Sequence, residues 1–206
     1  MKGCDLNVSG SHQAGSLPEG PGLPLLRQLR EDLATAHGDV LAPGFHAVAV
    51  HRFGSWAGTR SSRARPILIL VYKVGYLVMR NVYGIEIPRT VRIGRRVKIA
   101  HQSGIVIHPN SSIGDDCVIR QNVSIGAAAG DAGRFHAQAP QLGRGVSVGA
   151  GAVIVGGVSI GDGAVLGPNV TVLTNVPAHA RVMAAPPRTI QMPPAVASRE
   201  AEHRGA

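Results

Sequence analysis

The sequence predicts a mainly β protein: a parallel β-helix preceded by a small α-helical N-terminal region. The first observation is a six-residue period of aliphatic residues, broken by one two-residue shift and one longer interruption. This period matches neither the 3.6-residue repeat of an α-helix nor the two-residue alternation of an ordinary strand. Its members are Ile87, Ile93, Ile99, Ile105, Ile107, Ile113, Ile119, Ile125, Leu142, Val148, Ile154, Ile160, Leu166 and Val172.

Two further observations support this fold. Glycine often follows the aliphatic residue directly, and glycine tolerates the backbone dihedrals of tight turns. The chain of 206 residues has 27 glycines and 14 prolines but only 3% aromatic residues, so its core must be aliphatic. This composition fits many short strands joined by turns better than it fits a helix bundle. The glycines that follow aliphatic residues are Gly94, Gly114, Gly126, Gly143, Gly149, Gly161 and Gly167.

Each repeat of a parallel β-helix forms one flat face and one turn, and the aliphatic side chain points inward. Three faces make one coil of about 18 residues, and the coils stack about 4.8 Å apart. The register shifts by two residues between Ile105 and Ile107. The interruption between Ile125 and Leu142 predicts a loop at residues 127–141 that leaves the array. Loops carried by a rigid scaffold are common places for functional residues.

The rest of the chain divides around this array. Residues 1–23 are rich in Gly, Ser and Pro, and residues 188–206 form a polar tail, so we expect both ends to be disordered. A helical region is expected at residues 24–84 and the β-helix domain at residues 85–187. Within the helical region, the patterns favour helices at residues 25–37, 45–56 and 66–82.

The first expected helix places four leucines on one face: Leu25, Leu26, Leu29 and Leu33. The pair Pro43-Gly44 is expected to break the chain before the second helix. The third follows an apolar run that is too short for an ordinary transmembrane helix and is interrupted by Lys73. Arginines flank this run, so peripheral contact with anionic lipid is an alternative. A buried or interfacial helix is the preferred interpretation.

The chain is basic, with a formal net charge of +9. The basic residues are not interleaved with aromatic stacking groups, and no nucleic-acid-binding motif is present, so we expect no nucleic-acid partner. A small polyanion such as CoA would use the same charge. A solvated basic surface without a specific role is the alternative.

Cys4 and Cys117 are the two cysteines. They give no disulfide framework, and a reducing cytoplasm is therefore the expected location. Residues 1–20 lack the apolar stretch of a secretory signal. Cys117 occupies a repeat position, so we expect it in the core rather than at a reactive site.

Several repeats resemble the hexapeptide-repeat acyltransferases: Ile93-Gly94, Ile113-Gly114, Ile160-Gly161 and Leu166-Gly167. The resemblance implies a left-handed β-helix, which is an exception to the right-handed crossover rule. It also implies a homotrimer with active sites between adjacent prisms. The shortened helical region favours this trimer over a dimer of trimers.

Other segments narrow the match to the serine O-acetyltransferase family, in a short subfamily. The resemblance covers roughly residues 28–187. It is carried by Leu29-Arg-Glu-Asp32, Gly44-Phe-His-Ala-Val-Ala-Val-His51-Arg52, Ile85-Glu86-Ile87-Pro88, Ala100-His101-Gln-Ser-Gly104-Ile-Val, Gly149-Ala-Gly-Ala152 and Val176-Pro177-Ala-His-Ala.

The resemblance implies a transferase that moves acetyl from acetyl-CoA to the hydroxyl of L-serine, without a metal, for cysteine biosynthesis. Three departures leave the acceptor more open than the donor. Glu86 stands where typical members have Asp, and Pro88 follows without the usual His. The loop lacks the usual Gly-Gly-Asp-Arg-His-Pro pattern. The chain also lacks the C-terminal Ile with which members dock into cysteine synthase, so that complex is not expected.

A hydroxyl needs a general base to attack a thioester at neutral pH, and histidine suits this task. His101 is the candidate base, and the alternative is a polar residue at a coil corner. Glu86 lies fifteen positions earlier, close to one coil, so it could meet His101 and orient the imidazole. Transfer would then be direct, in a ternary complex of enzyme, acetyl-CoA and acceptor.

The remaining candidates bind substrates. The resemblance implies that acetyl-CoA lies against Gly126, Ala127, Ala150 and Gly151, although small residues also fit tight turns. Arg134 could pair with an acceptor carboxylate, and His136 could bind the acceptor. Asp39 could hold the amine of serine.

Three other functions remain open. The acceptor could be a sugar hydroxyl in polysaccharide biosynthesis. A β-helix carbonic anhydrase would need three histidines around zinc; His101, His108 and His136 exist, but their spacing does not match that family. The third alternative is a non-catalytic scaffold, which would not bind acetyl-CoA.

Overall fold

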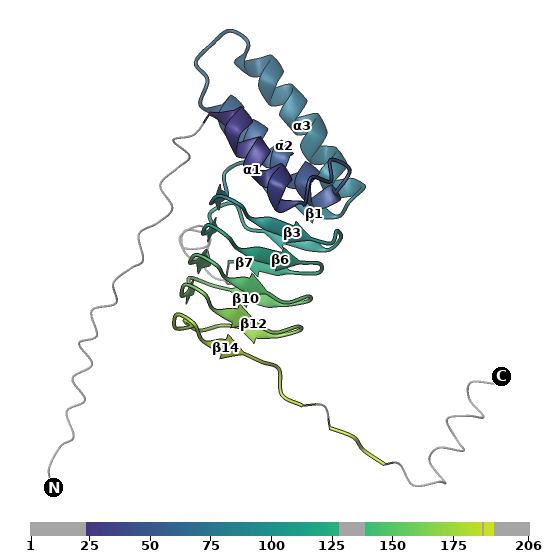
Figure 1. Cartoon of the computed structure of the whole chain (residues 1–206), viewed down its shortest axis with the longest axis vertical. Coiled ribbons are helices and arrows are strands. Elements are labelled where there is room, and N and C mark those ends of the chain that lie inside the picture. The colour runs from purple at the N-terminus through teal and green to yellow at the C-terminus, as the bar shows by residue number, and fades with distance from the viewer. Residues whose placement is uncertain (1–23, 128–138, 187, 192–206) are drawn as a thin grey trace, which may run out of the picture.

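The computed structural model describes residues 24–127, 139–186 and 188–191. Helices α1 (Leu25–Thr35), α2 (Pro43–Gly58) and α3 (Arg65–Asn81) lie at one end of a stack of β-coils (Figure 1). This confirms the expected parallel β-helix preceded by three helices. Pro43 is the first residue of α2 rather than a break outside it, because proline fits the first turn of a helix.

Three parallel sheets form the faces of the stack. The first face is β1 (Ile85–Glu86), β4 (Ile105–Ile107), β7 (Ser124–Gly126), β10 (Val153–Val155) and β13 (Thr171–Val172). The second is β2 (Arg92–Ile93), β5 (Ser112–Ile113), β8 (Gln141–Leu142) and β11 (Ser159–Ile160). The third is β3 (Lys98–Ala100), β6 (Val118–Arg120), β9 (Ser147–Val148), β12 (Val165–Leu166) and β14 (Arg181–Val182).

The strand register explains the two breaks in the period. Ile85 pairs with Ile105, so the first coil is two residues longer than the 18-residue coil between Val106 and Ser124. Ser124 pairs with Val153, which adds eleven residues to a coil of 18. Residues 128–138 account for the addition and lie outside the described residues. The chain therefore leaves the array after β7 and rejoins it in the same register at β8.

The aliphatic residues of the six-residue period fill the interior of the prism. Every one of them is buried, with at most 7% of its surface exposed. Cys117 shares this core and is fully buried, as expected from its repeat position. Burial raises the pKa of its thiol to about 12, so Cys117 is a packing residue rather than a nucleophile.

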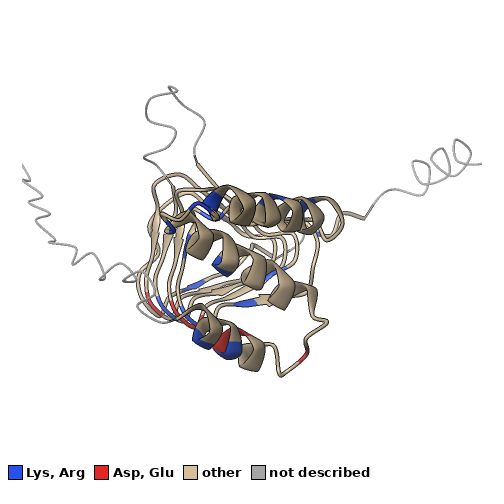
Figure 2. Ribbon diagram, turned by 90° about the horizontal axis from the view of Figure 1, so that it is seen from above, with Lys and Arg blue, Asp and Glu red and all other residues tan. Residues whose placement is uncertain are grey.

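The helices pack on one another and on the first coil, with α2 between α1 and α3 (Figure 2). Gly44 makes the close approach between α2 and β3 possible, because a Cβ there would overlap the carbonyl oxygen of Ile99. Gly54 serves the same purpose towards α3, where a Cβ would overlap the ring of Tyr72.

The leucine face expected for α1 is partly buried: Leu25, Leu29 and Leu33 are half-buried, but the most deeply buried residues of the helix are polar. Leu26 is 73% exposed, whereas the polar residues Gln28 and Asp32 are buried. The reason is the guanidinium of Arg52, which reaches Asp32 from α2. A buried charge pair therefore shares the inner face of α1 with the half-buried leucines and helps to set the orientation of the helix.

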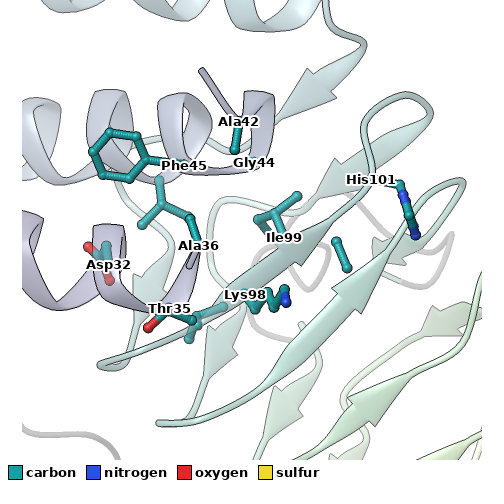
Figure 3. Close-up of a pocket in the computed structure, with 12 residues that line it drawn as sticks. Asp32, Thr35, Ala36, Ala42, Gly44, Phe45, Lys98, Ile99 and His101 are labelled. Atoms are coloured by element: carbon teal, nitrogen blue, oxygen red, sulfur yellow. The ribbon is translucent and has the colours of Figure 1, made fainter. Parts of the chain in front are cut away.

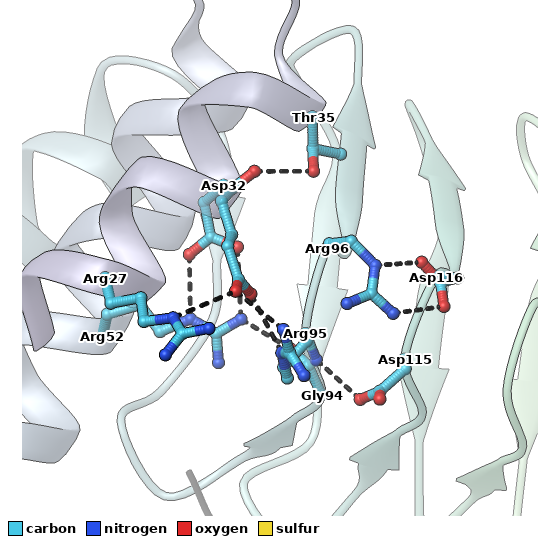
Figure 4. Close-up of polar contacts among 10 residues, drawn as sticks. Arg27, Asp32, Thr35, Arg52, Gly94, Arg95, Arg96, Asp115 and Asp116 are labelled. Atoms are coloured by element: carbon cyan, nitrogen blue, oxygen red, sulfur yellow. Dashed lines mark hydrogen bonds and ion pairs between the residues drawn. The ribbon is translucent and has the colours of Figure 1, made fainter. Parts of the chain in front are cut away.

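Arg52 joins the helices to the first coil (Figure 4). Its Nε and Nη2 donate to the two carboxylate oxygens of Asp32, at 3.0 and 3.4 Å. Its Nη1 donates to the carbonyl of Ile93 at 2.7 Å, and Nη2 also donates to the carbonyl of Gly94. The side chain thus ties α1, α2 and β2 together.

The helix α3 has an apolar face that no other described residue covers. Its members follow helical spacing and are between 41% and 66% exposed: Ile67, Leu70, Val71, Val74, Leu77 and Val78. The opposite face, with Tyr72 and Met79, is buried. In the described part of the chain, no helix is long and apolar enough to cross a membrane.

Candidate active site

A pocket of about 230 Å³ lies between the helices and the first coil (Figure 3). Residues of α1, of the start of α2 and of β3 line it, and His101 stands at one side. Asp32 and Thr35 contribute from α1, and Lys98 contributes from β3. Gly44, whose backbone packs closely against β3, is also one of the lining residues.

His101 follows β3 directly, at the corner where the chain passes from the third face to the first. Its φ is +67°, and Ser103 and Gly104 also have positive φ. Only glycine adopts this backbone conformation freely. At His101 and Ser103 it therefore costs a conformational free energy on the order of 1 kcal/mol each, and strained residues of this kind are frequent at functional sites. A Cβ at Gly104 would overlap the side chain of Asn122 in the coil below. This tight corner presents the His101 side chain on the surface.

The imidazole of His101 is accessible to a substrate. The residue is exposed, and no hydrogen bond or ion pair to its ring occurs among the residues that the structure describes. An unoccupied ring nitrogen beside a pocket is what a general base requires. The role of His101 as the base stays a prediction.

Glu86 lies on β1, in the same coil as His101, and pairs in register with Val106. Its Oε1 accepts a hydrogen bond from the hydroxyl of Tyr76 in α3, at 3.2 Å. Burial and the Glu86 carboxylate raise the pKa of Tyr76 to about 12, so Tyr76 stays protonated and donates. The structure shows no hydrogen bond between Glu86 and His101, and their expected partnership stays a prediction.

Asp39 does not line the pocket. It is exposed, and its Oδ1 accepts a hydrogen bond from the backbone N–H of Leu41 at 2.9 Å. The acidic residue in the wall is Asp32. The sequence interpretation missed Asp32 and Lys98 as lining residues. The segment that ends at Asp32 was a sequence signal, whereas nothing in the local pattern distinguished Lys98.

The four residues expected to bind acetyl-CoA lie at opposite ends of two paired strands. Ala150 and Gly151 precede β10, at the same corner of the prism as His101, two coils away. Gly126 ends β7 and pairs with Val155, and Ala127 follows it. Gly126 lies beside Val155, which is four residues after Gly151. At about 3.3 Å per residue, the Ala150–Gly151 pair is therefore roughly 13 Å from the Gly126–Ala127 pair, a distance that an extended ligand can bridge.

Backbone geometry accounts for the glycine at one of these positions but not at another. Gly151 has a φ of +71°, and a Cβ there would overlap the side chain of Asn169. A turn alone therefore accounts for Gly151. At Gly126, by contrast, a Cβ would meet no atom within 4 Å. The described residues do not require a glycine there, so Gly126 is the more informative of the two for a ligand.

Arg134 and His136 lie outside the described residues. The zinc alternative needed His136 together with His101 and His108. Within the residues that the structure describes, no three His, Cys, Asp or Glu side chains are grouped so that they could hold a metal ion.

A prism of six-residue coils capped by helices, with an accessible histidine at a corner, defines the class of hexapeptide-repeat transferases. The family model described as bacterial transferase hexapeptide (six repeats) matches residues 139–174. Serine acetyltransferases of Vibrio cholerae and soybean superpose with a TM-score of 0.66 each, at 26% identity. They cover 80% and 81% of this chain and 64% and 69% of their own. The likeness confirms the left-handed β-helix.

Proteins that are similar in sequence are also serine acetyltransferases. The serine acetyltransferase of Helicobacter pylori is 33% identical over 151 residues, which are 73% of this chain and 83% of that protein. The chain belongs to the serine acetyltransferase family. The enzymes of Synechococcus elongatus and Mycobacterium tuberculosis are 33% and 34% identical over 72% of this chain. The chain spans only 57% and 61% of the length of those two relatives.

Proposed function

We propose that the protein is an O-acetyltransferase that moves acetyl from acetyl-CoA to the hydroxyl of L-serine and so forms O-acetylserine for cysteine biosynthesis. The observation that carries the proposal is the position of His101, exposed at the side of a pocket in a member of this family. Because acetyl-CoA is made and used inside cells, the proposal places the protein in the cytoplasm.

The proposed reaction is a direct transfer in a ternary complex. His101 takes the proton from the serine hydroxyl as its oxygen attacks the carbonyl carbon of the thioester. A C–O bond forms, the C–S bond breaks, and the proton passes from the imidazolium to the departing sulfur of CoA. A positioned base of this kind contributes about 10²–10⁴-fold to the rate.

Glu86 is the proposed positioning residue for His101. A carboxylate beside an imidazole fixes its tautomer and stabilises the imidazolium. Tyr76 holds one oxygen of Glu86 and leaves the other available. Acetyl-CoA is proposed to lie along the first face, between the corner at Ala150 and Gly151 and the end of β7 at Gly126 and Ala127.

The proposal includes a homotrimer, supported by the uncovered apolar face of α3. Monomeric proteins rarely expose a contiguous aliphatic surface of this kind, because its burial is favourable. Partner subunits could cover it. Residues 127–141, with Arg134 and His136, are proposed to complete the acceptor site, and Asp39 stays a candidate for the serine amine.

The test is thiol release from acetyl-CoA in the presence of L-serine, for the wild type and for His101→Ala. We expect saturable release that falls at least a hundredfold in the variant, as loss of a general base predicts. His179→Ala is the matched control, because His179 also has a positive φ, of +60°, at an exposed corner of the last coil. Its release should equal that of the wild type.

Two results would contradict the proposal in different ways. Undiminished release in His101→Ala would show that His101 is not the base. No serine-dependent release, with acetyl-CoA still bound in calorimetry, would show that serine is not the acceptor and would favour a sugar hydroxyl. Failure to bind acetyl-CoA would favour the scaffold alternative.

A further inference from the structure

The charged groups of the pocket are few. Asp32, Lys98 and His101 are the ionisable side chains among its described lining residues. Since His101 is the proposed base, Asp32 and Lys98 decide which charged groups of an acceptor the pocket can bind.

Asp32 is not free to bind a cation. Its side chain is 3% exposed, and its two carboxylate oxygens accept hydrogen bonds from Nε and Nη2 of Arg52. An acceptor ammonium would have to compete with a buried guanidinium that is also held by the Ile93 and Gly94 carbonyls. Asp32 is the only carboxylate among the described lining residues of the pocket, so this lining offers no carboxylate that is free to bind a cation.

Lys98 is available. Its Nζ lies 2.9 Å from Nε2 of His37, and no ion pair to Lys98 occurs among the described residues. A lysine ammonium has three N–H donors, so two remain after the bond to His37. In this contact Nε2 of His37 accepts, because a lysine ammonium only donates.

The end of α1 places His37 against Lys98. The N–H groups of His37 and Gly38 donate to the carbonyls of Ala34 and Leu33, and both residues have positive φ. This turn closes the helix and directs the ring towards β3. The C-terminal end of a helix carries partial negative charge, which also favours a cation such as Lys98 nearby.

From this charge arrangement we propose that Lys98, held by His37, binds an anionic group of the acceptor, a carboxylate or a phosphate, while His101 deprotonates the acceptor hydroxyl. The inference rests on the proposed O-acetyltransferase function and adds a specificity residue to it. For L-serine the anionic group is the α-carboxylate. For a sugar acceptor it would be a uronate or a phosphate.

The experiment compares acceptors that differ only in that charge. Thiol release is measured with L-serine and with L-serinamide, which lacks the carboxylate, for the wild type, Lys98→Met and Lys98→Arg. Loss of a charged hydrogen bond predicts a KM for L-serine about 10- to 100-fold higher in Lys98→Met. The KM for L-serinamide and for acetyl-CoA should not change, and Lys98→Arg should restore most of the L-serine affinity.

A merely structural role for Lys98 predicts a different result, namely equal changes for L-serine and L-serinamide. Such equal changes, or no change for either, would overturn the proposal. If the wild type does not use L-serine, the proposed serine acceptor fails separately. The comparison is then made with methyl galacturonoside and methyl galactoside. A preference for the uronate that disappears in Lys98→Met supports the proposal, and equal use or no use of the pair overturns it.

Discussion

Asp32 of α1 and Arg52 of α2 form a buried ion pair, with Nε of Arg52 3.0 Å from Oδ2 of Asp32. Both side chains are almost completely removed from solvent, at 3% and 4% exposure. The same guanidinium donates to two backbone carbonyls of the first coil. The pair therefore fixes the position of the helices over the prism, and Asp32 is at the same time part of the pocket wall.

Asp32→Asn should destabilise the protein by about 3–5 kcal/mol, because it leaves the buried Arg52 charge without a counterion. Urea denaturation followed by circular dichroism measures the change. The matched control is Asp39→Asn, since Asp39 is exposed and an amide can still accept from the Leu41 N–H. It should stay within about 0.5 kcal/mol of the wild type. Equal stabilities of the two variants would show that the pair does not hold the helices.

His51 should make the folded state sensitive to acid. Its Nε2 donates to the carbonyl of Val91 at 2.9 Å, and burial, followed by the charge of Arg52, lowers its pKa from 6.5 to about 4. Between these values the unfolded chain binds a proton that the folded protein does not bind. The stabilisation is therefore complete above about pH 6.5 and is lost as the pH falls towards 4.

The expected loss from this group is about 2 kcal/mol between pH 7 and pH 5. His51→Gln is the comparison, because its amide can donate to Val91 and does not titrate. Urea midpoints at the two pH values should differ less in His51→Gln than in the wild type. An identical pH dependence in both proteins would assign the acid sensitivity to other groups.

The exposed face of α3 should be a subunit interface. The wild type is expected to have about three times the chain mass of 21.4 kDa in light scattering coupled to gel filtration. Val74→Glu places a charge in the middle of the apolar face and should give the mass of one chain. Ala34→Glu is the control, because Ala34 is exposed on α1, away from that face, and its mass should stay that of the wild type.

Two outcomes would contradict this prediction. A monomeric wild type would rule out the trimer. A Val74→Glu variant that keeps the mass of the wild type would place the subunit contacts outside the exposed face of α3.

The repeats could be found from sequence because their geometry is local. Each aliphatic residue takes its inward position from the turn beside it, so the period from Ile87 to Val172 predicts the buried core. The same pattern locates the two-residue shift and the interruption after Ile125. The helices are also local, and their expected bounds differ from the structure by only a few residues.

The face of α1 could be predicted only in part. The leucine pattern grouped Leu26 with the half-buried leucines, but Leu26 is 73% exposed, and Asp32 is buried because it pairs with Arg52, twenty positions away. The hydrogen bond from Tyr76 of α3 to Glu86 had no sequence signal either. Both outcomes depend on how the helices dock, which a periodic pattern does not contain.

The sequence by itself determined the coiled prism, its inward aliphatic residues and the corner position of His101, because each follows from a repeat only six residues long. The tertiary structure alone decided that Asp32 forms an ion pair with Arg52 and that Lys98 donates a hydrogen bond to His37, which is 61 positions away in the chain. The physical reason is that long-range polar contacts pair single side chains, whose partners are set by the packing of whole elements and leave no local pattern.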